Sequence, residues 1–231
     1  MTFGDRYDSL SAKDKSEWAE RFVGFFHALG VLFFVVPIFL FDEHLAANPV
    51  LGHSDWPIRV YAASTGYFLW DIVVSVISWR RGGDFGFVVH GVCCFCVYIF
   101  CFRPYLQFYA SVFLIFELST PFLHLVWFCE RIGLKDHPIR AVFAVLLALC
   151  FFCSRIVFGL YQSYKFFKDT FALADEIPPF LIWFYSIINI ILCTLNIYWF
   201  SLIVKKAVRQ ITRSSSTELQ KPSSVPDKAK D

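Results

Sequence analysis

Six apolar stretches of 18 to 25 residues are separated by short polar breaks along the chain. They are Phe22–Phe41, Ile58–Trp79, Phe85–Phe102, Tyr105–Cys129, Ile139–Tyr161 and Phe180–Val204. About 20 helical residues cross the apolar core of a bilayer, and a helix satisfies all of its own backbone hydrogen bonds there. The pattern therefore predicts an all-α fold, a polytopic membrane protein with a bundle of six transmembrane helices.

The polar segments between and around these stretches define the predicted domain organisation. Residues 1–20 form a charged N-terminal segment, and residues 21–206 form one six-helix transmembrane domain. Residues 207–231 are rich in Ser, Pro and charged residues and are predicted to be a disordered tail, because such a composition cannot bury a core. The third and fourth stretches are separated only by Arg103-Pro104, which predicts a tight antiparallel hairpin between them.

Composition supports a membrane class and excludes several others. The chain is 57% hydrophobic, 20% aromatic and 17% charged, whereas soluble domains carry roughly 25% charged residues. This excludes a soluble domain, a disordered chain and a disulfide framework; the eight cysteines lie in or beside apolar stretches and are interpreted as packing residues. The net charge of +2 gives no reason to expect a nucleic-acid partner. Membrane lipids are the expected partners.

The distribution of Lys and Arg predicts the orientation of the bundle. With six spans, 16 of these residues fall on the side that carries both termini and 4 fall on the other side, while Arg155 lies inside a span. Cytosolic segments carry the excess of positive charge in membrane proteins. Both termini are therefore predicted to be cytosolic.

Six charged residues or histidines lie well inside the apolar stretches, away from their ends: His27, Asp71, His90, Glu117, His124 and Arg155. Such residues are expensive in lipid and usually face a bundle interior or a wet cavity. Glu117 and His124 are seven residues apart, which places them on one stripe of a regular α-helix. Pro121 lies between them and is expected to kink that helix and open a cavity.

Two further stripes of polar residues follow helical spacing. They comprise Ser64, Asp71, Ser75 and Ser78 in the second stretch, and Ser186, Asn189, Cys193 and Asn196 in the sixth. Together the stripes predict a shared polar interior, with Ser119, Thr120, Arg155, Asn189 and Asn196 as the residues lining a lipid cavity. Two alternatives stay open: polar stripes also hold helices together, and Arg155 either extends to the membrane surface or pairs with Glu117.

The candidate catalytic residues are His90, Glu117, Asp71 and His124. A carboxylate beside a histidine fixes its tautomer and raises its basicity, as general-base chemistry requires. The alternative is that each histidine is simply packed and hydrogen-bonded. No metal site is expected: Asp42, Glu43, His44 and His53 carry ligand chemistry, but they share one polar loop without recognisable ligand spacing.

The strings Gly66-Tyr-Phe-Leu-Trp-Asp71 and Glu117-Leu-Ser-Thr-Pro-Phe-Leu-His124, with His90 between them, resemble the TLC family over about residues 21–206. The resemblance is nearest to the small, poorly characterised TLC-domain proteins. In the ceramide synthases of this family a pair of histidines and an Asp-x-Ser-Asp segment are taken as the acyl-transfer site. Here one histidine stands at His90, and the segment is Glu117-Leu-Ser119-Thr120. The resemblance implies a lipid-holding bundle in the endoplasmic reticulum.

The leading hypothesis is a protein that holds or modifies a lipid in an intramembrane cavity, with a role in membrane lipid homeostasis. If it is an enzyme, acyl transfer is the expected class: His90 is the base or acyl acceptor, Glu117 or Asp71 orients it, and His124 assists. No cofactor is expected, and an acyl-CoA would be the co-substrate. The alternatives are a non-catalytic lipid-sensing or membrane-composition regulator, and a trafficking adaptor that acts through residues 212–231. The oligomeric state stays open.

Overall fold

The computed structural model describes residues 10–219, and no strand occurs among them. In chain order the helices are α2 (Ala12–Phe41), α3 (Glu43–Ala47), α4 (Asp55–Arg80), α5 (Phe85–Phe100), α6 (Gln107–Leu114), the 3₁₀ segment η1 (Ile115–Ser119), α7 (Thr120–Arg131), α8 (Pro138–Phe151), the π segment η2 (Phe152–Phe158), α9 (Gly159–Ala172), the 3₁₀ turn η3 (Ala174–Glu176) and α10 (Pro179–Leu219). The all-helical prediction is confirmed.

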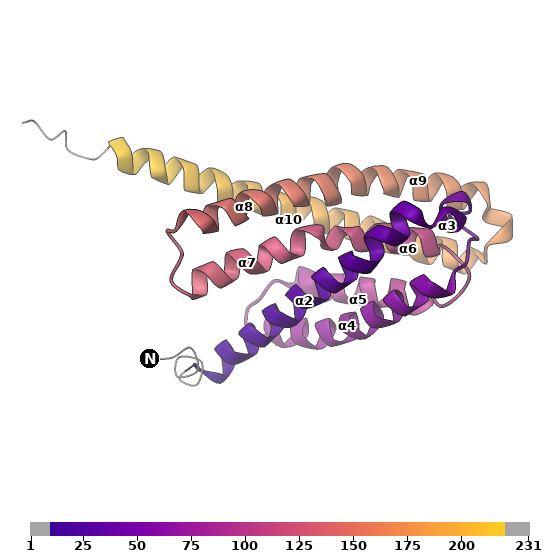
Figure 1. Ribbon diagram of the computed structural model, residues 1–231, viewed down its shortest axis with the longest axis horizontal. Coiled ribbons are helices and arrows are strands. Elements are labelled where there is room, and N and C mark those ends of the chain that lie inside the picture. Colours follow the sequence, from indigo (N-terminus) through magenta and orange to yellow (C-terminus); the bar gives the residue numbers. More distant parts are fainter. Residues whose placement is uncertain (1–9, 220–231) are drawn as a thin grey trace, which may run out of the picture.

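Six rods run back and forth along the bundle (Figure 1), because α6, η1 and α7 form one continuous rod and α8, η2 and α9 form another. The start of α2 and the end of α10 lie at the same end of the bundle, which we call the terminal end. The short helix α3 and the connection between α9 and α10 lie at the opposite end, which we call the distal end.

Five of these rods are long and apolar enough to cross a membrane, counted over the described residues: Ala12–Phe41, Asp55–Arg80, Gln107–Arg131, Pro138–Ala172 and Pro179–Arg209. The sixth rod, α5, has 16 residues, which at 1.5 Å per residue span about 24 Å. A bilayer core is about 30 Å thick. The multi-pass character is supported, and a sixth full span stays a prediction.

The helix α10 extends past the boundary that the sequence suggested for the transmembrane domain. A disordered tail was expected from residue 207, but the backbone stays helical to Leu219. The remainder of that expected tail, residues 220–231, and residues 1–9 of the N-terminal segment lie outside the described residues.

Local sequence signals fix several helix ends. The side chain of Ser11 accepts a hydrogen bond from the Asp14 N–H at the start of α2, and Asp84 accepts one from the Gly86 N–H at the start of α5. These contacts satisfy backbone donors that have no partner inside the helix. Gly82, just past the end of α4, has φ of +91°, a conformation that favours glycine.

The third and fourth stretches do not form the tight antiparallel hairpin that was predicted. The helix α5 packs most extensively against α4, whereas α6 packs against α2. Leu106 turns the chain away from α5: its φ is +60°, and its N–H donates to the Val50 carbonyl of another loop (2.7 Å). One bridge does link the two helices, from the Tyr98 hydroxyl to the Ala110 carbonyl (2.9 Å). The separation leaves room for a cavity between α5 and α6.

The main apolar core lies toward the distal end of the bundle. It includes Val35 of α2, Tyr61 of α4, Tyr109 of α6 and Leu181 of α10. Large apolar side chains also cover the outside, among them Phe33 and Phe41, which are 73% and 76% exposed. Apolar side chains therefore fill the distal half of the bundle. The buried polar side chains of the middle and of the terminal half lie between helices.

Candidate functional site

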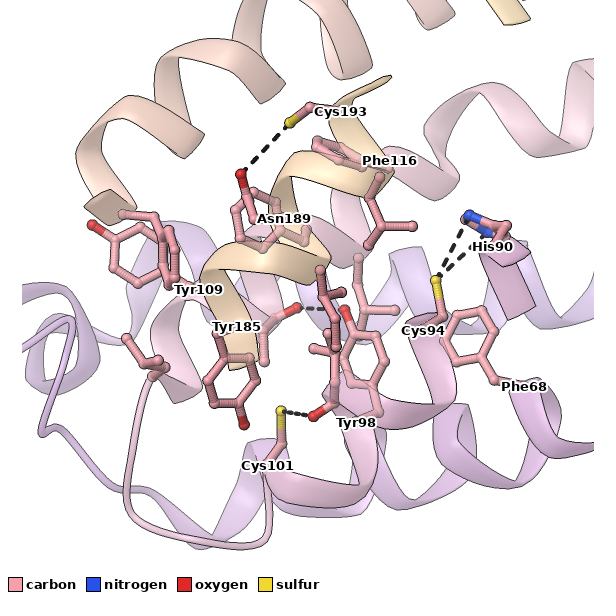
Figure 2. Close-up of a pocket in the computed structure, with 18 of the residues that line it drawn as sticks. Phe68, His90, Cys94, Tyr98, Cys101, Tyr109, Phe116, Tyr185, Asn189 and Cys193 are labelled. Atoms are coloured by element: carbon pink, nitrogen blue, oxygen red, sulfur yellow. Dashed lines mark hydrogen bonds between the residues drawn. The ribbon is translucent and has the colours of Figure 1, made fainter. Parts of the chain in front are cut away.

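An elongated cavity lies between α5, the α6–η1 rod, α9 and α10 (Figure 2). Its walls are mostly apolar and aromatic, with Tyr98, Phe113, Phe166 and Leu192 among them. Along α10 it runs from Tyr185 to Asn196, which at 1.5 Å per residue is about 16 Å. Its volume is about 60 Å³, enough for a few water molecules in its present shape.

Arg155 forms the polar end of this cavity and is held by hydrogen bonds to two other rods, α6–η1–α7 and α10. Its Nε donates to the Phe116 carbonyl (3.0 Å) and to the Ser119 hydroxyl (3.2 Å). Its Nη1 donates to the Asn196 Oδ1 (3.2 Å), and its Nη2 donates to the Thr120 hydroxyl (3.4 Å). The guanidinium is therefore fixed in place.

Pro121 explains why a backbone carbonyl is available to Arg155. Proline has no N–H, so the Glu117 carbonyl cannot receive the usual bond from residue 121. The Thr120 N–H donates to the Glu117 carbonyl instead, in the 3₁₀ pattern, and no longer bonds the Phe116 carbonyl. Arg155 donates to that freed carbonyl. The predicted break at Pro121 is thus present as the 3₁₀ segment η1.

Glu117 neutralises the buried arginine. Its Oε1 lies 3.7 Å from the Arg155 Nη2, and the two side chains are 10% and 7% exposed. Of the two alternatives for Arg155, the structure therefore shows pairing with Glu117. Gly159 lets η1 approach closely here, because a Cβ at that position would lie 2.8 Å from the Phe116 ring.

Arg155 sits in the π segment η2, where the helix holds one extra residue in its turn. Such π-bulges are rare and occur frequently at functional sites. Ser154, the neighbouring residue, donates from its hydroxyl to the Cys150 carbonyl (2.7 Å). No sequence signal indicated this segment.

His90 lines the cavity from α5, and its nearest polar neighbour is a cysteine. The Cys94 Sγ lies 3.6 Å from the His90 Nε2 and 3.8 Å from the Nδ1 (Figure 2). The imidazole also contacts the Trp199 ring edge-on, with centroids 5.4 Å apart. Cys94 also lines the cavity, although sequence reasoning took all cysteines as packing residues. The signal that could have found it is the four-residue spacing from His90, which places both on one face of a helix.

The polar stripe of α10 faces this cavity as its spacing predicts. Asn189, Cys193 and Asn196 are among the lining residues, and the Cys193 thiol donates to the Asn189 Oδ1 (3.6 Å). Ser119 and Thr120 do not line the cavity, but both accept hydrogen bonds from Arg155. The cavity therefore combines an apolar body with a polar end made by Arg155, Glu117 and Asn196.

His124 does not share this cavity, contrary to the expected common stripe with Glu117. It packs against α2, where its Nε2 would lie 2.7 Å from a Cβ added to Gly24. Seven residues advance a helix by about 10 Å, so His124 lies closer to the terminal end than Glu117, past the polar end of the cavity. His90 and His124 therefore do not share the cavity.

Asp71 lies between α4 and α5 and does not line the cavity. Its Oδ2 would lie 3.0 Å from a Cβ added to Gly91, the residue after His90. The stripe of α4 is buried at Ser64 and Ser75 and half-buried at Asp71. Among residues 10–219, no group of three or more His, Cys, Asp and Glu is placed to hold a metal ion.

Comparison with known proteins gives consistent results over nearly the whole chain. The model of the TLC domain matches residues 17–205. An uncharacterized TLC domain-containing protein of Schizosaccharomyces pombe is 29% identical, over 93% of this chain and 73% of its own. One of Saccharomyces cerevisiae is 34% identical, over 78% of this chain and 60% of its own. TLC domain-containing protein 4 of Homo sapiens is 29% identical, over 89% of this chain and 80% of its own. No solved structure matches the chain significantly.

Proposed function

The chain belongs to the TLC domain family, and from this premise we propose that it holds or modifies a membrane lipid in the cavity that ends at Arg155. We propose that it does so in an intracellular membrane, the endoplasmic reticulum, as part of membrane lipid homeostasis, with both termini in the cytosol. The five long apolar helices support a multi-pass membrane protein. The relatives compared above carry TLC domain names rather than ceramide synthase names, so ceramide synthesis is not the proposal.

One observation carries the proposal: the cavity is apolar along its length and polar at one end. Arg155, Glu117 and Asn196 supply donors and acceptors there, and Phe113 and Leu192 belong to the apolar body. Ligand sites typically combine apolar walls with a few placed polar groups. A molecule with one polar group and one acyl chain matches that division. Such a molecule can enter only if α5 and α10 move apart, because the volume of the cavity is about 60 Å³.

Acyl transfer is the reaction that we propose if the lipid is modified. A hydroxyl or amine of the acceptor lipid attacks the thioester carbonyl of an acyl-CoA, and the neutral His90 imidazole takes the proton of the attacking group. The carbon–sulfur bond breaks, and the CoA thiolate leaves and receives a proton. His90 lines the cavity and is the group within it suited to this role. Asp71, beside Gly91, is the carboxylate proposed to support it.

A non-catalytic lipid holder is the second candidate, and the surroundings of His90 favour it. Among residues 10–219, no carboxylate lies within hydrogen-bond distance of the His90 ring, whose polar neighbour is Cys94. Glu117, one expected orienting group, is paired with Arg155 instead. A regulator that senses lipid composition requires the cavity but no general base.

The experiment compares the His90→Ala variant with wild-type protein in cells that lack the endogenous protein. Co-purifying lipids and the cellular lipid profile are both measured by mass spectrometry, with exposed His44→Ala as the matched control. Loss of the lipid-profile effect with the lipid still bound supports catalysis. Retention of both supports the non-catalytic holder. Absence of any co-purifying lipid from wild-type protein would falsify both. A chain lacking residues 212–231 keeps either cavity function, whereas a trafficking adaptor loses its function.

A further inference from the structure

We propose that a second lipid site lies between α2 and α4, where His27 and His124 bind the hydroxyl group of an uncharged membrane lipid. This site is separate from the Arg155 cavity and does not rest on the function proposed for it. The proposal starts from two histidines that the cavity does not use.

His124 is buried and His27 is half-buried, and neither has a hydrogen-bond partner in residues 10–219. All four ring nitrogens, two in His27 and two in His124, are shielded from solvent and have no partner within the described residues. His124 is 7% exposed. Most buried polar side-chain atoms in proteins have a partner, so each one that lacks a partner calls for an explanation. Two such side chains beside the same tyrosine indicate a place where a polar group binds.

Tyr67 connects the two histidines. Its ring stacks on the His27 ring with centroids 3.6 Å apart and planes 9° apart. A Cβ added to Gly24 would lie 3.3 Å from the Tyr67 hydroxyl and 2.7 Å from the His124 Nε2. The Tyr67 hydroxyl and the His124 imidazole therefore flank the same turn of α2. A ligand reaches both histidines when the Tyr67 ring turns away from His27.

A hollow on the outside of the bundle leads to this cluster. Its volume is about 500 Å³, and its lining residues are Phe22, Val23, Phe26, His27, Tyr67 and Trp70. The rims are open, with Phe22 41% and Phe26 63% exposed. Because both helices belong to candidate membrane spans, the space outside this hollow is the bilayer. The occupant is therefore a membrane lipid.

The lining predicts the chemistry of that lipid. None of the six lining residues is Lys, Arg, Asp or Glu. Arg21, one residue before Phe22, acts electrostatically on His124 and Tyr67, but its charge is offset by Glu17 and Glu20. Its guanidinium lies 5.6 Å from the centroid of the Trp127 ring on α7. An uncharged headgroup fits these surroundings. A neutral imidazole has one donor and one acceptor nitrogen, and a hydroxyl group both donates and accepts. The aromatic walls fit a sterol or the acyl chains of a diacylglycerol, and both carry a single free hydroxyl.

The test uses purified full-length protein in phosphatidylcholine nanodiscs with photoactivatable lipid probes. One probe is a sterol and the other is a diacylglycerol, and each has a partner probe in which the hydroxyl is methylated. Labelled peptides are mapped by mass spectrometry. We expect labelling within residues 22–27 or 67–70 by a hydroxyl probe, and about tenfold less by its methyl ether, the factor for roughly one hydrogen bond. The probe that labels identifies the source of the hydroxyl.

The variants separate hydrogen bonding from folding. His27→Leu and His124→Leu are expected to lower labelling about tenfold, whereas His124→Gln, which donates and accepts, is expected to keep most of it. His44→Leu, at the exposed distal end, is the control that leaves labelling unchanged. His90→Ala also leaves it unchanged, so this site and the cavity are tested separately.

Three results would overturn the proposal. The first is equal labelling by the hydroxyl and methyl ether probes, which would show that only apolar contact matters. The second is undiminished labelling in both leucine variants, which would leave water as the partner of the histidines. The third is the absence of labelling in residues 22–27 and 67–70 by either probe in correctly folded wild-type protein.

Discussion

One buried polar region lies on each of two faces of the η1–α7 rod, and the two regions differ in how their polar atoms are paired. On the face toward η2 and α10, Arg155 donates to four oxygen acceptors and pairs with Glu117. On the face toward α2, the ring nitrogens of His27 and His124 have no partner. Both regions contain ionisable side chains that the membrane disfavours.

The difference separates polar residues that hold the fold from polar residues that are available to a ligand. A buried charge with a full set of partners stabilises the arrangement of the helices around it. A buried imidazole without partners does not stabilise the fold until a polar group reaches it, because its nitrogens have lost their bonds to water. Substitution of each by an apolar residue should therefore give different results, and three predictions test this contrast.

The largest expected effect belongs to Arg155→Leu. This change leaves Glu117 buried without its cation and removes the donor of the Phe116 carbonyl and of Asn196. Breaking a buried pair in this way lowers the free energy of unfolding by about 3–5 kcal/mol, which lowers Tm by roughly 10 °C. The measurement is thermal unfolding in detergent followed by size-exclusion fluorescence.

The double variant Arg155→Leu with Glu117→Gln serves as the control for this prediction. It removes the uncompensated carboxylate together with the arginine, so it should unfold at a higher temperature than Arg155→Leu alone. A single variant that melts with the wild-type protein would show that Arg155 does not hold the rods together.

Gly24→Ala has the next largest expected effect. Its Cβ would lie 2.7 Å from the His124 Nε2 and 3.1 Å from the Cε1, so the imidazole must move. Crowding of this kind costs about 1–3 kcal/mol. The matched control is Gly30→Ala in the same helix, which meets nothing within 4 Å and should be neutral or stabilising by less than about 1 kcal/mol. Equal melting temperatures for the two variants would refute the close contact between α2 and His124.

His124→Leu has the smallest expected effect on stability. Since neither ring nitrogen has a partner, the substitution removes unpaired polar atoms and puts an apolar side chain of similar size in their place. In lipid-free detergent the free energy of unfolding should change by less than about 1 kcal/mol. A destabilisation as large as that of Arg155→Leu would mean that His124 has a structural partner and would remove the contrast between the two faces.

The hydrophobic pattern was sufficient to predict the all-helical bundle and most helix limits. Proline also predicted a helix irregularity correctly: Pro121 indicated a break, and η1 ends two residues before it. The pattern placed the start of the disordered tail at residue 207, whereas the backbone of α10 stays helical to Leu219, because basic and serine-rich residues do not by themselves end a helix. It also gave the wrong hairpin, because the path at Leu106 depends on a bond to Val50 far away in sequence.

The candidate site was predictable in its residue types and only partly in its geometry. Arg155, Asn189 and Asn196 line the cavity, since each lies on the inner stripe of a long helix. His124 was expected beside Glu117 because seven residues return to the same stripe of an α-helix, but it lies about 10 Å further toward the terminal end, past the cavity. The partnership of His90 with Cys94 was missed because cysteine is usually a small packing residue.

The π segment η2 gives the α8–α9 rod a further property. The rod packs on α7 before this segment and on α6 and α10 after it. Because each π turn holds one extra residue, the seven residues of η2 turn the chain about as far as six residues of α-helix. Removing one residue between Phe152 and Phe158 would therefore restore an ordinary α-helix and leave Gln162 and Phe166 facing the bundle, so a single-codon deletion at this point would be absorbed locally, in the segment that carries Arg155.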